Sequence, residues 1–389
     1  MSVTLTDRQS ILALFGLNAV LNGGLFARLP EVQRALDLSE QQFGLALAAL
    51  SAGVMAAMQV APRIAARVGT RRMILGSFIS ASLLPPLFGI LPSFALLVAV
   101  TGLLGFLSAI AGAAMNVEAD RVARSSGRPL MSLSHGTWSL VFMVVTGISA
   151  LAIRAGVTPI QQFVTITVVM LAGIQILIRP MPESEAEPGG TASPRFVLPN
   201  RATFLLMGFG LISVVVEIVV RNWSIVIVRD IFAPPGWIAA TALPLFIGLQ
   251  TAGRLLADRV AARIGDVALG RAFCVMTAAG LIMLALSPSV WTALFSCAVI
   301  GLGTSATYPL VITAVVRRGD RPATEAVAAF IFLQNILSAL SPVLFGTVAG
   351  LTDPRLAVAL LLPVVAVSFA FTRELGPQAG SEGVLSSRA

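Results

Sequence analysis

Two opposite charges lie four residues apart within a long apolar run of this chain. Glu217 and Arg221 fall inside residues 202–228, where most other side chains are aliphatic or aromatic. A spacing of four places both side chains on one face of a helix. An ionisable side chain in such a run is a candidate functional group. Glu217 would bind a proton or a charged ligand group, with Arg221 competing for its carboxylate. The alternative is a permanent ion pair that orders the helix.

A second group of ionisable residues lies where two apolar runs meet. Asn116 and Glu118 come at the end of the fourth run, and His135, the only histidine, comes early in the fifth. Consecutive helices joined by a short loop are antiparallel neighbours, so the three side chains could meet. A histidine titrates near neutral pH, which makes the group a candidate proton relay. Alternatively, Glu118 pairs with Arg121 or Arg124, and His135 only packs against its neighbours.

Uncharged polar residues also occur inside the apolar runs. Asn18 and Asn22 are one helical turn apart in the first run, where amides either bond a neighbouring helix or bind a ligand. A tryptophan such as Trp138 stacks on a sugar or an aromatic ligand, although such residues more often pack in the interior. The remaining candidates for a binding site in these runs are Gln250, Tyr308, Gln334 and Asn335.

The sequence carries no motif for catalysis or for a bound cofactor. A single histidine offers no second imidazole for a metal, and no Walker loop, HExxH or GxSxG sequence occurs. We therefore expect no enzyme activity, no cofactor and no metal site. The two cysteines lie inside apolar runs and are too few for a disulfide framework.

Membrane-spanning helices are the elements predicted to position these side chains. Of the 389 residues, 57% are apolar and 11% are charged, whereas a soluble domain is about a quarter charged. The runs do not alternate as barrel strands would, and open strands cannot satisfy their backbone in lipid. Ser39 and Gln42 form a predicted capping box before the second run. The twelve predicted spans are residues 9–29, 41–62, 72–91, 93–115, 130–153, 157–178, 202–228, 237–257, 268–287, 290–314, 324–350 and 354–373.

The arginines predict the orientation of these spans. All 26 basic residues are arginines, and 20 of them lie near the chain ends or between an even-numbered span and the next. Cytoplasmic loops carry such an excess, so both termini are predicted to be cytoplasmic. Arginines placed singly between apolar runs do not suit nucleic-acid binding. The six exceptions to the bias are Arg28, Arg34, Arg154, Arg221, Arg229 and Arg355.

The chain is predicted to consist of two six-helix halves. Residues 181–200 are rich in Pro, Gly and acidic residues, as in a flexible linker. We therefore divide the chain into a bundle at 1–180, a cytoplasmic linker at 181–200 and a second bundle at 201–389. A shift of 196 places residues 65–69 (AARVG) on residues 261–265 (AARIG), and a shift of 199 places His135 on Gln334. A nearly constant offset indicates an internal repeat.

Residues 253–259 (GRLLADR) resemble the signature loop of the major facilitator superfamily, and the twelve-span plan is similar to that superfamily along nearly the whole chain. Residues 115–118, 134–136 and 217–224 are similar to its fucose-permease-like bacterial branch. The resemblance implies an all-α membrane fold of two pseudo-symmetric six-helix bundles. It also implies a gate, and the candidate gating residues are Arg63, Arg67, Arg254, Asp258 and Arg259.

The sequence departs from this superfamily in two places. Pro62 stands where the repeat would place a second aspartate, equivalent to Asp258. The fifth span lacks the Gly- and Pro-rich motif that is typical of drug/proton antiporters. Both departures weaken an interpretation as a drug antiporter. The alternative to a gate is that the arginines of residues 253–259 only fix the orientation of the helices in the membrane.

The resemblance implies a secondary active transporter that moves a small solute across the inner membrane by alternating access. It suggests a sugar or small polar metabolite as substrate. Protons are the expected coupling ion, because protonating a buried carboxylate changes which conformation is favoured. A drug or metabolite efflux antiporter is the alternative, and a non-transporting receptor or sensor and a membrane-embedded enzyme are alternatives from other classes. Only 15 residues follow Glu374, which is short for a signalling domain. We expect a monomer in a lipid bilayer, with no nucleic-acid partner.

Overall fold

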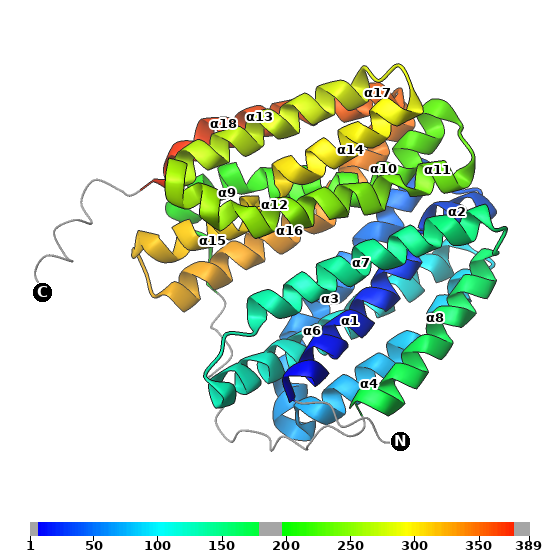
Figure 1. The fold of residues 1–389 in the computed structure, drawn as a ribbon, viewed down its shortest axis with the longest axis horizontal. Helices are drawn as coiled ribbons and strands as arrows, with labels where there is room; N and C mark the ends of the chain where they lie inside the picture. Colours follow the sequence, from blue (N-terminus) through cyan, green and yellow to red (C-terminus); the bar gives the residue numbers. More distant parts are fainter. Residues whose placement is uncertain (1–6, 179–196, 377–389) are drawn as a thin grey trace, which may run out of the picture.

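The protein folds into two groups of long helices that lie side by side. A computed structural model describes residues 7–178 and 197–376, and these residues contain no strand. Figure 1 shows α1–α8 in one group and α9–α18 in the other. We call residues 7–178 the N-terminal half and residues 197–376 the C-terminal half. Most of the predicted linker, residues 181–200, lies outside the described residues.

Within the N-terminal half, each predicted span is formed by one helix or by two consecutive pieces. The helices are α1 (Asp7–Phe26), α2 (Leu29–Ala35), α3 (Glu40–Val68), α4 (Thr70–Ser82), α5 (Pro85–Phe88), α6 (Phe94–Ser126), α7 (Met131–Arg154) and α8 (Pro159–Gly173), which ends in the π-helical turn η1 (Ile174–Ile178).

Several spans of the C-terminal half are likewise divided. The helices are α9 (Arg201–Leu211), the π-helical turn η2 (Ile212–Val216), α10 (Glu217–Phe232), α11 (Gly236–Ala240), α12 (Ala242–Ile264), α13 (Asp266–Ala285), α14 (Val290–Thr304), α15 (Thr307–Arg318), α16 (Ala323–Leu351), α17 (Pro354–Ala359), α18 (Leu362–Ala370) and the 3-10 turn η3 (Phe371–Leu375).

Eleven helical stretches of the described residues are long and apolar enough to cross a membrane. The protein is therefore a multi-pass membrane protein, as the sequence predicts. The third predicted span is the exception, since α4 ends at Ser82 and α5 begins at Pro85. Pro85 and Pro86 have no amide hydrogen to donate and crowd the preceding turn. The prediction of one uninterrupted helix at residues 72–91 was therefore wrong.

The start of α3 and the end of α12 test two local predictions. The predicted capping box is confirmed: the Gln42 amide donates to Ser39 Oγ at 3.2 Å, and the Ser39 amide donates to Gln42 Oε1 at 3.0 Å.

The predicted helix end near Asp258 was wrong, because α12 continues to Ile264. The arginines of this segment end the apolar run without ending the helix. Asp258 therefore lies within a helix and does not cap it.

The internal repeat is visible in the backbone where equivalent helices end. α3 is followed by Gly69 with φ 78° and ψ 159°, and α12 by Gly265 with φ 83° and ψ 157°. Each glycine amide donates to the carbonyl of the alanine four residues before it. A positive φ favours glycine, so AARVG and AARIG specify the same helix end. This likeness supports the offset of 196 found in the sequence.

Two lines of contact join the halves: α3 packs against α16, and α7 packs against α11 and α12. We call the end of the bundle that contains Glu40, Arg154 and Phe232 the distal end, and the end that contains Asp7 and Leu375 the proximal end. A Cβ on Gly44 would lie 2.4 Å from the Pro342 carbonyl oxygen, and one on Gly346 would lie 2.5 Å from that of Glu40. The two halves therefore touch backbone to backbone at the distal end.

Candidate functional site

A polar cluster on α1 and α7 brings together three of the predicted residues. The Trp138 indole Nε1 donates to Asn18 Oδ1 at 2.9 Å. Asn22 Nδ2 donates to the same oxygen at 3.2 Å and to the Asn18 carbonyl at 2.8 Å. Trp138 also stacks on Phe142, with ring centroids 4.9 Å apart. All three polar side chains are half-buried, so this wall offers amides and an aromatic face together.

His135 lies one turn before Trp138 on α7. Its ring meets Phe15 edge to face, with centroids 5.2 Å apart, and the side chain is exposed. Arg254 of α12, in the other half, acts electrostatically on His135. The Arg254 Nε donates to the Ser305 carbonyl at 2.9 Å. The two predicted residues therefore lie within electrostatic range of each other, one in each half.

Glu217 is buried inside the protein and not exposed to the surrounding lipid. Arg221 Nη1 lies 3.7 Å from Glu217 Oε1, as their spacing predicts. The π-helical turn η2 ends immediately before Glu217, and π-turns occur preferentially at functional sites. Such a turn frees a backbone carbonyl, and Ser341 Oγ of α16 donates to the carbonyl of Val214 at 3.1 Å. The irregular turn, bonded to α16, thus directly precedes the Glu217 carboxylate.

Glu118 has partners other than the predicted histidine. Its side chain is buried, the Thr70 hydroxyl donates to Oε1, and the Arg121 Nε donates to Oε2 at 2.7 Å. Within the described residues, no hydrogen bond joins Glu118 to His135 or to Asn116, which is exposed. The geometry therefore corresponds to the ion-pair alternative with Arg121.

The other predicted polar residues lie along the C-terminal half. Gln250 is buried and its Nε2 donates to Thr304 Oγ1 at 3.4 Å, and Tyr308 is half-buried. Asn335 Nδ2 donates across the seam to Met58 Sδ at 3.3 Å. The neighbouring Gln334 Oε1 is buried without a hydrogen-bond partner. This oxygen is an acceptor that no group of the described residues satisfies.

The predicted gating charges do not form ion pairs with one another in this conformation. Arg63, Arg67, Asp258 and Arg259 are exposed. Among the ion pairs of the described residues, none includes Asp258. Arg254, the fifth predicted residue, bonds a carbonyl within its own half instead.

Burial along the seam changes from the distal to the proximal end. At the distal side Trp223 is buried between Phe43 and Phe345, and both pairs of ring centroids are 5.2 Å apart. Toward the proximal end His135 is exposed, and the other seam residues Trp138, Arg254, Gln334 and Asn335 are only half-buried. The seam is therefore closed distally and more accessible proximally.

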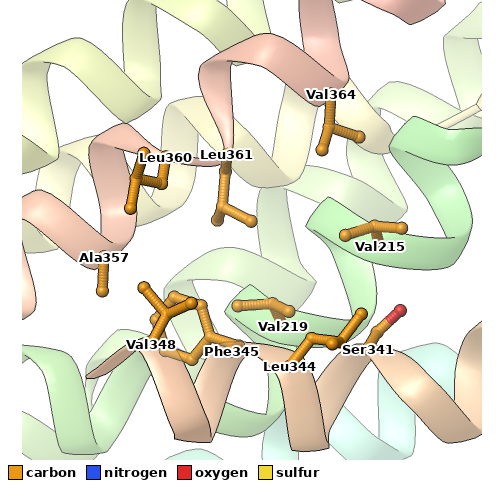
Figure 2. Close-up of a pocket in the computed structure, with 10 residues that line it drawn as sticks. All are labelled: Val215, Val219, Ser341, Leu344, Phe345, Val348, Ala357, Leu360, Leu361 and Val364. Atoms are coloured by element: carbon orange, nitrogen blue, oxygen red, sulfur yellow. The ribbon is translucent and has the colours of Figure 1, made fainter. Parts of the chain in front are cut away.

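A separate pocket of about 160 Å³ lies between the seventh, eleventh and twelfth spans (Figure 2). Nine of its ten lining residues are apolar. The exception, Ser341, already donates to the carbonyls of Val214 and Leu337. This pocket offers no group that would orient a polar solute.

Sequence reasoning missed two polar clusters at the distal end. Arg28 is buried and donates to Gln162 Oε1 at 2.8 Å and to the Val157 carbonyl at 2.9 Å, and it pairs with Glu31 at 2.9 Å. The second cluster surrounds Arg229. Arg28 and Arg229 are two of the six arginines that do not follow the bias of arginines toward the proximal end. Their unusual position was the sequence signal that could have revealed these two clusters.

The long apolar helices and the polar residues along the seam between two similar groups define a multi-pass membrane protein built from two helical halves. The chain belongs to the Major Facilitator Superfamily, whose family model matches residues 11–342, and it is a transporter of that superfamily.

Relatives and solved structures agree with this assignment. An uncharacterised MFS-type transporter of Yersinia pestis is 27% identical over 345 residues, which cover 87% of this chain and 88% of that protein. The uncharacterised transporter y4wD of Sinorhizobium fredii is 25% identical over 371 residues, covering 93% and 97%. The nucleoside transporter NupG superimposes with a TM-score of 0.74 at 12% identity, covering 96% of this chain and all of that one. A bacterial homologue of the human lysosomal transporter Spinster, in an inward-facing and occupied conformation, gives 0.70 at 12% identity, covering 98% and 97%.

Proposed function

We propose that the protein is a proton-coupled secondary transporter that moves a small polar solute across the inner membrane by alternating access. The observation that carries the proposal is Glu217, a buried carboxylate beside Arg221 that follows a π-helical turn in the seventh span. At 3.7 Å the attraction is about 4 kcal/mol at an effective dielectric constant of 20, before desolvation is subtracted. Protonation of Glu217 would remove this attraction and release Arg221.

The shape of the seam supports an inward-facing state in this proposal. The halves touch at the distal end, while polar seam residues are accessible from the proximal end. The arginine bias supports a cytoplasmic proximal end. In this arrangement residues 1–180 and 201–389 are the two rocking bodies, and residues 181–200 are the linker. The unpaired charges Arg63, Arg67, Asp258 and Arg259 would form the inner gate in the opposite, outward-facing state.

A sugar or a nucleoside is the substrate class that the site chemistry supports best. Asn18, Asn22 and Gln334 supply amides for hydroxyl groups, and Trp138 supplies a face on which a sugar or a base stacks. The structural neighbour NupG is a nucleoside transporter, which agrees with this class. His135 and Arg254 stand at the proximal side of this wall, where a proton leaving Glu217 would pass toward the cytoplasm.

The test is proton-driven uptake in proteoliposomes after a thermal-shift screen of sugars, nucleosides and carboxylates has identified a solute. We expect Glu217→Gln to abolish accumulation driven by a pH gradient and to retain solute counterflow, which needs no net proton movement. The control is Asp120→Asn, because Asp120 and Arg124 form an exposed surface pair that contributes little. Proton-driven accumulation by Glu217→Gln at the wild-type level would contradict the proposal.

A further inference from the structure

Six arginines do not follow the bias of arginines toward the proximal end, and their contacts differ in whether they stay within one half or cross between the halves. Arg28 and Arg355 bond only within their own halves. Arg355 donates to the carbonyls of Ala285 and Ser287 and lies over the Phe232 ring. Two others reach across the seam, and each lies on a different line of contact between the halves.

Arg229 crosses the seam beside α3. From the end of α10 in the C-terminal half, its Nη1 donates to the Pro30 carbonyl and to Gln33 Oε1, both at 3.2 Å. Its Nη2 lies 3.8 Å from Glu40 Oε1, an oxygen that also accepts from Gln33 Nε2 at 2.9 Å. The Arg229 side chain is only 15% exposed. One guanidinium therefore holds three residues of the N-terminal half.

Arg154 crosses the seam on the other line of contact. It ends α7 in the N-terminal half, and its guanidinium lies 4.9 Å from the centroid of the Trp237 ring of α11. Such a cation–π contact is weaker at an exposed position than when it is desolvated. Arg154 is therefore the weaker of the two contacts.

We propose that Arg229 and Arg154 form an outer latch that holds the distal end shut in the inward-facing state. The inference rests on the alternating-access function, because distal opening must separate Arg229 from Gln33 and Glu40. Asp230 holds the Arg229 guanidinium from the C-terminal half. It already accepts from the Arg229 Nε at 2.5 Å and from Nη2 at 3.0 Å, and it moves with the C-terminal half. The guanidinium therefore keeps a carboxylate partner when Gln33 and Glu40 withdraw, and release does not leave its charge unpaired.

The test measures the distal separation directly in the full-length protein. Gln41 of α3 and Leu351 of α16 are both exposed at the distal end. Each is replaced by a cysteine in a Cys274→Ser/Cys297→Ser background. The two new cysteines carry spin labels, and the distance between the labels is measured in nanodiscs. We expect Arg229→Gln to raise the population of the longer distance about tenfold, equivalent to ~1.4 kcal/mol, and Arg154→Gln to raise it less. Arg355→Gln is the matched control, because it removes an equal charge and contacts within one half only.

The outcomes separate the latch from the transport proposal. An unchanged distance distribution in Arg229→Gln, or an equal change in Arg355→Gln, would overturn the latch. If Arg229→Gln does not fold, Gln33→Ala and Glu40→Gln probe the same latch from the other half, and both should lengthen the distance. The distance measurement needs neither solute nor a pH gradient. A failure of the Glu217→Gln transport experiment therefore leaves the latch standing, and a failure of the distance experiment leaves proton coupling by Glu217 standing.

Discussion

The close crossing of α3 and α6 gives a sharp prediction for a single added methyl group. A Cβ on Gly105 of α6 would lie 2.0 Å from the Leu50 carbonyl oxygen, and one on Gly53 of α3 would lie 2.0 Å from that of Gly102. Small residues permit such approach between membrane helices. Ordinary contact begins at 3.4 Å, so the backbones would have to separate by about 1.4 Å. Overpacking of this kind costs about 1–3 kcal/mol.

The measurement is thermal unfolding of Gly105→Ala in detergent, compared with Gly112→Ala on the same helix. Gly112 lies seven residues later, close to the same face, and a Cβ there meets nothing within 4 Å. We expect Gly105→Ala to lower Tm by about 2 °C and Gly112→Ala to raise it slightly, because alanine restricts the unfolded chain. Equal shifts in the two variants would refute the reasoning from helix approach.

Two further substitutions test the polar clusters. Gln162→Leu should destabilise the protein by about 3 kcal/mol. The substitution leaves Arg28 Nε without its buried acceptor and removes the hydrogen bonds from Gln162 to Gly24 and Ser149. A Tm equal to that of the wild type would contradict a stabilising role for these hydrogen bonds. Trp138→Phe keeps the ring but removes the donor to Asn18. It should raise the KM for transport about fivefold with kcat retained, as expected for the loss of ~1 kcal/mol of binding. A lower kcat at constant KM would instead assign Trp138 to the conformational change.

The predicted pairs were most reliable where both residues lie on one helix. Glu217 and Arg221 pair as their spacing indicates, and the α3 capping box forms as its sequence specifies, because local helix geometry fixes both. The relay of Glu118 with His135 required two helices to take a particular rotation. Thr70, on a third helix, bonds Glu118 instead. No sequence pattern encodes that choice.

The sequence by itself determined the membrane-spanning architecture, because lipid offers no hydrogen-bond partners to the polar backbone of an apolar segment, which therefore satisfies its own groups as a helix. Its paired AARVG and AARIG segments also specified matching helix ends. Only the tertiary structure decided which arginines cross between the halves. Arg229 meets Gln33 and Glu40 about 190 residues away in the chain, while Arg355 stays within its half. Such contacts depend on how closely the helices approach and how each one is rotated, and both result from packing along the whole seam.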